Sequence, residues 1–352
     1  MIYRSVTIVL LFFSIANCYL FDGSEEDSVL IGLITIIIGN QSGGNESSGG
    51  GNGEGATDCS NNDLIWTMKQ SSHAANWRGV TYGNGLYVAV ATSTTNRVMT
   101  SSDGNTWTAR SAAEANEWMS VTYGNGLFVA VSIDGTNRIM TSPDGITWTA
   151  RPAPTVGTWH SVIYENNLFV AVASTGTHQV MTSTNGICWT ARSAAELNGW
   201  FGVAYGNGLF AAVSNFGTNR IMTSPDGINW TARTAPEANT WRPIVYGNGL
   251  FVAAANTGTN RVMTSPDAIN WTVRNVENST WFASAYGNGL FVIVADSSSN
   301  RILTSSDGIN WVANPAPEPN AWRSITFGKN QFVALSPDGT PGTNQVMTAN
   351  CD

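Results

Sequence analysis

The sequence predicts an all-β fold, a seven-bladed β-propeller with four antiparallel strands per blade. A unit of about 41 residues recurs along most of the chain, and the 14 tryptophans mark it in two series. The first series is Trp77, Trp118, Trp159, Trp200, Trp241, Trp281 and Trp322, and the second is Trp66, Trp107, Trp148, Trp189, Trp230, Trp271 and Trp311. A unit of this length cannot bury its own apolar surface, so the seven copies have to stack on one another.

Each unit reads as four short strands, and the copy that begins at Trp118 shows the first two. Residues 118–123 alternate as a strand does, and residues 127–131 are apolar throughout. Asn125 and Gly126 lie between them. An Asn-Gly step between two apolar runs is a strong hairpin signal, because a type I′ turn needs positive φ at both central residues.

The other two strands of this copy follow a polar loop. Residues 138–142 form the third strand and residues 147–151 the fourth, with Pro143, Asp144 and Gly145 as the turn between them. Proline presets φ for the first turn position, and glycine accepts the left-handed conformation. No unit has a 3.6-residue apolar period, so the repeat is not a helical solenoid.

The phase of the repeat predicts how the ring closes. The chain enters the repeat at residues 63–69, which align with a fourth strand, and it ends at residues 345–352, which align with a third strand. We therefore expect the N-terminal strand to become the outer strand of the last blade, because this pairing removes two open sheet edges. Cys59 and Cys351 fall at one end of this seam. A disulfide between them would close a loop of nearly the whole propeller and contribute roughly 4 kcal/mol in the chain-entropy model.

The turn between the third and fourth strands carries a motif. Residues 141–148 read Thr-Ser-Pro-Asp-Gly-Ile-Thr-Trp, with similar copies at residues 100–107, 223–230 and 304–311. The motif resembles the Asp-box of BNR-repeat and sialidase-type propellers, although here the glycine follows the aspartate directly. Over residues 62–352 the chain resembles the Asp-box-type propellers of bacterial secreted and lipid-anchored proteins. The resemblance implies the propeller fold but assigns no activity, because propellers host unrelated functions.

The N-terminal region predicts export and a lipid anchor. Residues 1–17 combine a positive charge, an apolar core and a small-residue boundary, which is the pattern of a signal peptide. We expect Cys18 to be acylated as the mature N-terminus of a lipoprotein at the bacterial outer membrane or cell surface. The alternative is a signal peptide that is cut nearby, which would leave the protein periplasmic or secreted. In the lipoprotein, residues 18–38 are the anchored segment. Their apolar stretch at 29–38 is too short to span a bilayer as a helix.

Composition limits the remaining choices. Residues 39–58 are rich in Gly, Ser and Asn and predict a flexible linker, so the propeller itself occupies residues 59–352. The formal net charge is −8, and Lys69 and Lys329 are the two lysines. This charge argues against nucleic acid as a partner, because nucleic-acid binding needs a positive field. We expect a monomer without a cofactor or metal.

Polar residues that recur at equivalent positions are predicted to be structural. The turn aspartates are expected to bond their own backbone rather than a metal ion. These aspartates are Asp103, Asp144, Asp226, Asp267 and Asp307. Strand arginines such as Arg97 and Arg138 are expected to form exposed pairs with loop glutamates such as Glu114, each worth under about 1 kcal/mol. Cys188 lies beside a blade tryptophan and is expected to be a small packed side chain.

One position differs among the copies and predicts the binding face. The residue directly after each tryptophan of the first series should lie at the start of the innermost strand, on the rim of the central channel. These residues are Arg78, Met119, His160, Phe201, Arg242, Phe282 and Arg323. The next position holds small residues, as packing requires, whereas this mixture of arginine and aromatic side chains is typical of binding hot spots.

The sequence therefore favours a binding or interaction module for a protein or glycan partner. Two alternatives are a sialidase-like glycan hydrolase and a structural component of an envelope assembly. Sialidases hold a substrate carboxylate with three arginines and attack with a Tyr–Glu pair, and no such non-repeating pair stands out in this chain. The three histidines, His73, His160 and His178, lack metal-ligand spacing. We therefore predict no catalytic residue.

Overall fold

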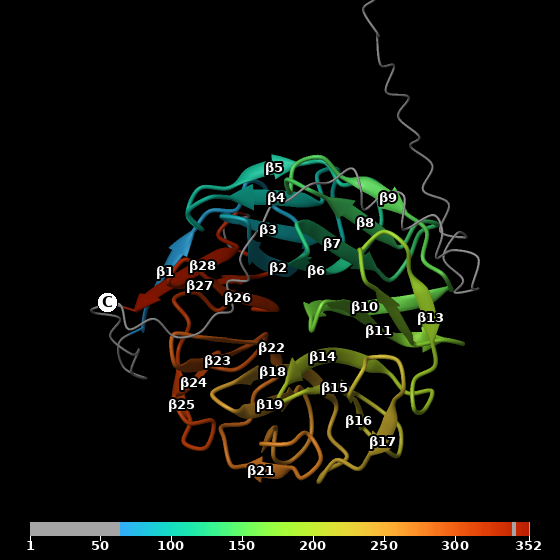
Figure 1. Ribbon diagram of the computed structural model, residues 1–352. Coiled ribbons are helices and arrows are strands. Elements are labelled where there is room, and N and C mark those ends of the chain that lie inside the picture. Colours follow the sequence, from blue (N-terminus) through green and yellow to red (C-terminus); the bar gives the residue numbers. More distant parts are fainter. Residues whose placement is uncertain (1–63, 340–342, 352) are drawn as a thin grey trace, which may run out of the picture. The chain divides into compact units, whose positions relative to one another are not determined.

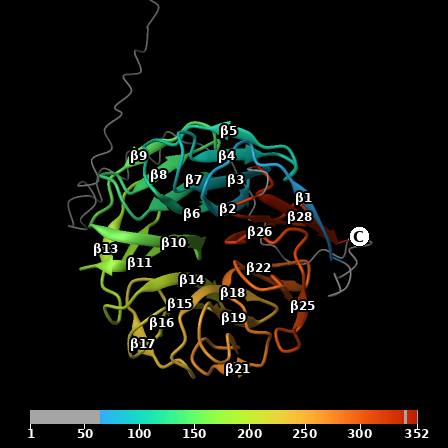
Figure 2. The same cartoon turned by 180° about the vertical axis from the view of Figure 1, so that it is seen from behind.

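The computed structural model describes residues 64–339 and 343–351, and within these residues every regular element is a β-strand (Figure 1). The strands form seven four-stranded sheets, each antiparallel throughout. The sheets follow one another around a ring, as Figures 1 and 2 show from its two sides. The predicted seven-bladed β-propeller with four antiparallel strands per blade is confirmed.

Each blade begins with its innermost strand and ends with its outermost one. Blade 1 consists of β2 (Trp77–Gly83), β3 (Leu86–Ala91), β4 (Val98–Ser101) and β5 (Thr108–Arg110), and blade 2 of β6 (Trp118–Gly124), β7 (Leu127–Ser132), β8 (Ile139–Ser142) and β9 (Thr149–Arg151). Blade 3 consists of β10 (Gly157–Glu165), β11 (Leu168–Gly176), β12 (Val180–Ser183) and β13 (Thr190–Arg192), and blade 4 of β14 (Trp200–Gly206), β15 (Leu209–Ser214), β16 (Ile221–Ser224) and β17 (Thr231–Arg233). Blade 5 consists of β18 (Trp241–Gly247), β19 (Leu250–Ala255), β20 (Val262–Ser265) and β21 (Thr272–Arg274). Blade 6 consists of β22 (Trp281–Gly287), β23 (Leu290–Ala295), β24 (Ile302–Ser305) and β25 (Val312–Asn314). Blade 7 consists of β26 (Ser324–Gly328), β27 (Gln331–Leu335), β28 (Val346–Cys351) and β1 (Leu64–Lys69).

The ring closes through β1, as predicted. This strand pairs antiparallel with β28, so that Leu64 lies opposite Cys351 and Lys69 lies opposite Val346. Figure 1 shows the blue N-terminal strand beside the red C-terminal one. Because β1 supplies the outer strand of blade 7, the first and last segments of the propeller hold each other in place.

The hydrophobic core lies between neighbouring blades. Trp118 of blade 2 is fully buried in a cluster with Val88 and Val90 of blade 1 and with Met140 of its own blade. The other six tryptophans of the first series are also fully buried. Each blade therefore covers the apolar face of the next, which explains why single copies would not be stable.

The two hairpin types form as their sequences predict. Asn125 and Gly126 both have positive φ, at 48° and 73°. In the second turn, Asp144 Oδ1 accepts hydrogen bonds from Ile146 N at 2.8 Å and Thr147 N at 2.9 Å. These two backbone donors hold the pKa of Asp144 below its ordinary value. The turn aspartates are thus structural, as expected.

The expected Arg–Glu pairs are not found among the described residues. Arg138 Nη1 donates instead to Ile133 O at 2.9 Å and to Gly157 O, in the next blade, at 2.7 Å. Glu114 accepts from Asn137 Nδ2 at 2.6 Å. The prediction was wrong because loop carbonyls that no strand pairs with need donors, and the arginines supply them.

The cysteines give a second correction. Cys188 is disulfide-bonded, so it is not a packed free thiol. The backbone of Cys351 ends β28, but its side chain is not described, and Cys59 lies outside the described residues. The predicted signal peptide at 1–17, the anchored segment at 18–38 with Cys18, and the linker at 39–58 also lie outside them.

Candidate functional site at the channel mouth

In six of the seven blades, a β-bulge presents the variable residue to the channel. In blade 2, Trp118 pairs with Ser132 and Ser120 pairs with Val131, so Met119 is an extra residue in β6. The same shift in register follows the first tryptophan in blades 1, 3, 4, 5 and 6. A bulge redirects one side chain without ending the strand. This local irregularity lets the tryptophan point into the core while its neighbour points into the channel.

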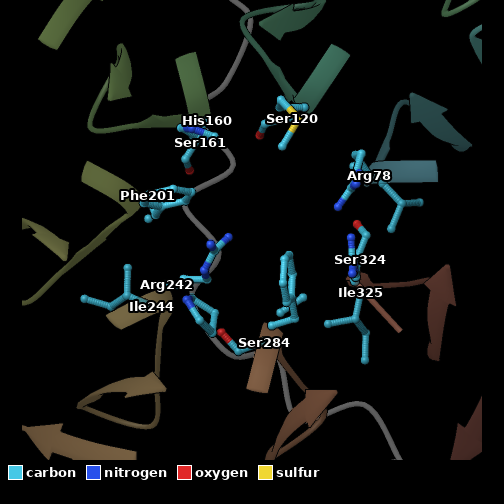
Figure 3. A pocket seen from close by; sticks show the side chains of 18 of the residues that line it. Arg78, Ser120, His160, Ser161, Phe201, Arg242, Ile244, Ser284, Ser324 and Ile325 are labelled. Atoms are coloured by element: carbon cyan, nitrogen blue, oxygen red, sulfur yellow. The ribbon is translucent and has the colours of Figure 1, made fainter. Parts of the chain in front are cut away.

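The structure brings all seven predicted residues together around one cavity of about 290 Å³. Figure 3 shows Arg78, His160, Phe201 and Arg242 reaching toward it from four blades. The residues that line it at this position are Arg78, Met119, His160, Phe201, Arg242, Phe282 and Arg323. The cavity therefore lies where the innermost strands begin, at the face opposite the Asn-Gly hairpins.

Small residues after the bulge let the innermost strands approach one another. A Cβ on Gly202 would lie 2.3 Å from Arg242 O of the next blade. At Gly79 it would lie 3.0 Å from Met119 O. The uniformity of this neighbouring position thus reflects packing, whereas the variable position faces open space.

Aromatic rings and guanidinium groups alternate along one side of the mouth. His160 stacks on Phe201 with ring centroids 4.1 Å apart. The Arg242 Cζ atom lies 4.3 Å from the Phe201 centroid and 4.9 Å from the Phe282 centroid. Arg323 Cζ lies 4.8 Å from the Phe282 centroid. These cation–π contacts fix the planes of two guanidinium groups in the cavity wall.

The three arginines of the mouth have few partners. Arg323 Nη2 forms a salt bridge with Asp296 at 3.0 Å. For Arg78 and Arg242 the structure shows neither a salt bridge nor a hydrogen bond within residues 64–339 and 343–351. The Nε atoms of all three are buried without a partner, as are His160 Nδ1 and Ser284 Oγ. Five polar atoms of residues that line one cavity thus lack a hydrogen-bond partner.

Burial and mutual repulsion shape the protonation of this site. Burial, followed by repulsion from Arg323 and Arg242, lowers the pKa of Arg78 to about 10. The pKa of Arg242 is lowered for the same reasons, by burial first and then by Arg323. Burial and the charges of Arg242 and Arg78 lower the pKa of His160 to about 3. At neutral pH, Arg78 is therefore cationic and His160 is neutral.

Two residues of the site were missed from the sequence. Asp296 pairs with Arg323, and Ser174 Oγ lies 3.0 Å from His160 Nε2. Both occupy the position that follows the buried part of the second strand. The equivalent residues in the other copies also differ, namely Thr92, Ile133, Asn215, Asn256 and Pro337. A comparison of copies at this second position was therefore the signal that could have found them.

Clusters of metal ligands and carboxylates with a shifted pKa are two features that would indicate a catalytic centre. No group of three or more His, Cys, Asp or Glu side chains in them could hold a metal ion. Burial raises the pKa of Glu165, but this residue ends β10 at its hairpin, whereas the arginines lie where the innermost strands begin. Within 64–339 and 343–351, no helix is long and apolar enough to cross a membrane.

Comparisons with known proteins agree on the fold. Residues 61–198 match the model of the DUF6242 β-propeller domain. A search of curated proteins finds no match. The chain is similar in structure to virginiamycin B lyase from Staphylococcus aureus, with 13% identity and a TM-score of 0.70 over 82% of this chain and 99% of that one.

A second similar structure is YCF48 from Cyanidioschyzon merolae, with 15% identity and a TM-score of 0.61 over 81% of this chain and 98% of that one. A third is YCF48 bound to D1 peptide, with 16% identity and a TM-score of 0.61 over 82% and 95%. Identities this low show a shared propeller fold alone. The function has to be argued from the channel mouth.

Proposed function

We propose that this protein is an interaction module that binds a protein or glycan partner at the channel mouth. One observation carries the proposal: the residues that differ among the copies gather around one cavity, where five buried polar atoms lack partners. A buried donor without a partner costs about 1–3 kcal/mol. A ligand that pairs with these atoms recovers that free energy on binding.

The site favours binding over hydrolysis. A sialidase-like hydrolase would need a carboxylate or another activated group beside the arginines. Asp296 is held by Arg323 at 3.0 Å, and Glu165 lies at the far end of its strand. The fold itself is neutral on this question, because the similar structures include a lyase and a propeller bound to a peptide. The role of an envelope structural component is a further alternative, which partner binding at the mouth would exclude.

We further propose that the propeller is exported and lipid-anchored at Cys18, on the bacterial outer membrane or cell surface. The signal-peptide pattern of residues 1–17 and the resemblance to Asp-box-type propellers support this. The disulfide at Cys188 limits this proposal, because a partner within the chain has to be one of the three other cysteines. These are Cys18, Cys59 and Cys351. In a chain whose Cys188 is bonded internally, an acylated Cys18 and a Cys59–Cys351 disulfide exclude each other.

The test begins with a screen of the full-length protein against glycan and extracellular-protein arrays. Once a partner is identified, we expect Arg78→Ala, Phe201→Ala and Arg323→Ala to weaken binding by at least about 1 kcal/mol each. Arg151→Ala is the control, since this arginine ends the outer strand β9, away from the cavity. Thermal unfolding of each variant shows whether the ring remains folded. Full affinity in the triple variant would exclude this face.

A further inference from the structure

The channel mouth is positive within an acidic protein. The whole chain has a formal net charge of −8, yet three guanidinium groups line one cavity. Asp296 forms a salt bridge with Arg323. Glu117 raises the pKa of Arg78, but its side chain is exposed, and water screens its charge. Asp296 also raises the pKa values of Arg78 and Arg242, so the three guanidinium groups share one carboxylate and two of their three positive charges are left uncompensated.

Two of the three guanidinium groups are held in place before any ligand binds. Arg242 lies against the rings of both Phe201 and Phe282, and Arg323 lies against Phe282 from its own blade. Figure 3 shows Arg78 and Arg242 pointing into the cavity from separate blades. Their mutual repulsion is part of the reason for the lowered pKa values of this site. An anion between them would remove this repulsion, and little conformational entropy would be lost.

We infer that the channel mouth binds a doubly charged, tetrahedral anionic group, a sulfate or phosphate ester, on the partner that the proposed function assigns to it. The inference rests on that function and names the chemistry of its ligand. Two uncompensated positive charges match two negative charges. A carboxylate would neutralise one of them and leave the other buried without a counter-charge.

The number of free donors points the same way. The Nε–H groups of Arg78, Arg242 and Arg323 are unpaired and come from three blades. A guanidinium group binds oxyanions through paired N–H donors, and a tetrahedral anion offers oxygens in several directions, whereas the two oxygens of a carboxylate share one plane. Three arginines that converge from different blades fit the tetrahedral geometry better.

The experiment uses the full-length protein and three simple anions at constant ionic strength: sulfate, inorganic phosphate and acetate. Calorimetric titration gives the affinities, and the Nε–H resonances of the arginines report which side chains respond. We expect one sulfate or phosphate per chain and at least about tenfold weaker binding of acetate. Arg78→Gln and Arg242→Gln should each weaken sulfate binding by about tenfold or more. Arg151→Gln removes the same charge elsewhere and should leave the affinity unchanged.

A comparison of binding at different pH values tests whether the site needs the second negative charge of the anion. Inorganic phosphate loses it at a pH somewhat above the value of about 6 at which phosphate esters do, whereas sulfate keeps both charges. Phosphate binding should therefore weaken between about pH 7.5 and pH 5.5, while sulfate binding does not. Arg78, Arg242, Arg323, His160 and Asp296 face the anion. The sulfate titration serves as the control for any change in these five groups.

Three results would overturn the inference: acetate that binds as tightly as sulfate, equal losses in Arg151→Gln and Arg78→Gln, or no saturable sulfate binding by the wild type. None of them decides the proposed function, because partner binding in the Arg78, Phe201 and Arg323 alanine variants tests that separately. Conversely, sulfate bound at the mouth together with a partner that ignores the triple variant would refute the proposed function and leave the anion site standing.

Discussion

At the residue scale, comparison of the copies identified the channel-mouth ring before the structure did. A residue that only packs should resemble its equivalents, as Gly202 and Gly79 do, and both face neighbouring backbone. The seven residues that differ among the copies line one cavity, and their role in binding stays a prediction. The sequence did not predict the salt bridge of Arg323 with Asp296, because the two lie 27 residues apart in adjacent blades and share no motif.

His160 makes stability depend on pH. Its native pKa is about 3, against an ordinary value of 6.5. Below pH 6.5 the unfolded chain takes up a proton that the native protein excludes, so the contribution of neutral His160 to stability is full above this pH and is lost as pH falls toward 3. We expect the free energy of unfolding of His160→Gln to fall less than that of the wild type over this window.

Urea unfolding at several pH values measures this difference. His178→Gln removes an exposed histidine and is the matched control. If wild type and His160→Gln lose stability in parallel as the pH falls from 6.5 toward 3, the buried neutral imidazole is not the cause.

At the element scale, the hairpins were predictable and the bulges were not. An Asn-Gly step has a fixed backbone requirement that the sequence displays. A bulge adds one residue to a strand, and no residue type marks it in this chain, since Arg, Met, His and Phe all occupy the extra position. In a regular strand, Met119 and Trp118 would point to opposite faces of the same sheet. Strand alternation alone therefore does not predict that the Met119 side chain lies on the channel.

The turn between the outer strands gives a prediction at this scale. We expect Asp144→Ala to destabilise the protein by about 1 kcal/mol, because Ile146 N and Thr147 N lose their acceptor. Asp144→Asn should be nearly neutral. Blade 3 already has Asn185 at this position, and its Oδ1 accepts from Ile187 N and Cys188 N at 2.9 Å. Equal losses of unfolding free energy in the two variants would show that charge, and not the hydrogen bonds, stabilises the turn.

At the scale of the whole molecule, the phase of the repeat predicted the closure of the ring. A chain that begins with a fourth strand and ends with a third has one way to complete its last sheet, and the pairing of β1 with β28 is the outcome. The partner of Cys188 could not be predicted, because a repeat pattern says nothing about a residue that departs from it.

Peptide mapping under non-reducing conditions resolves the four cysteines. A lipid anchor on Cys18 predicts that Cys59 and Cys351 are not bonded to each other, although such a bond is within reach, because Leu64 lies opposite Cys351 and five residues span at most about 17 Å. With that link in place, Cys18 is the remaining partner for Cys188 in this chain, and the lipid anchor would fall. A fatty-acylated Cys18 peptide would instead support the anchor and require Cys188 to bond Cys59 or Cys351.

The assignment of the channel mouth as a ligand site leads to a direct structural test, an experimental structure of the full-length protein with sulfate. We expect one anion in the cavity, within hydrogen-bonding distance of the guanidinium groups of Arg78 and Arg242, and absent when both residues are replaced by glutamine. An empty mouth in crystals that hold sulfate elsewhere on the chain would refute the assignment.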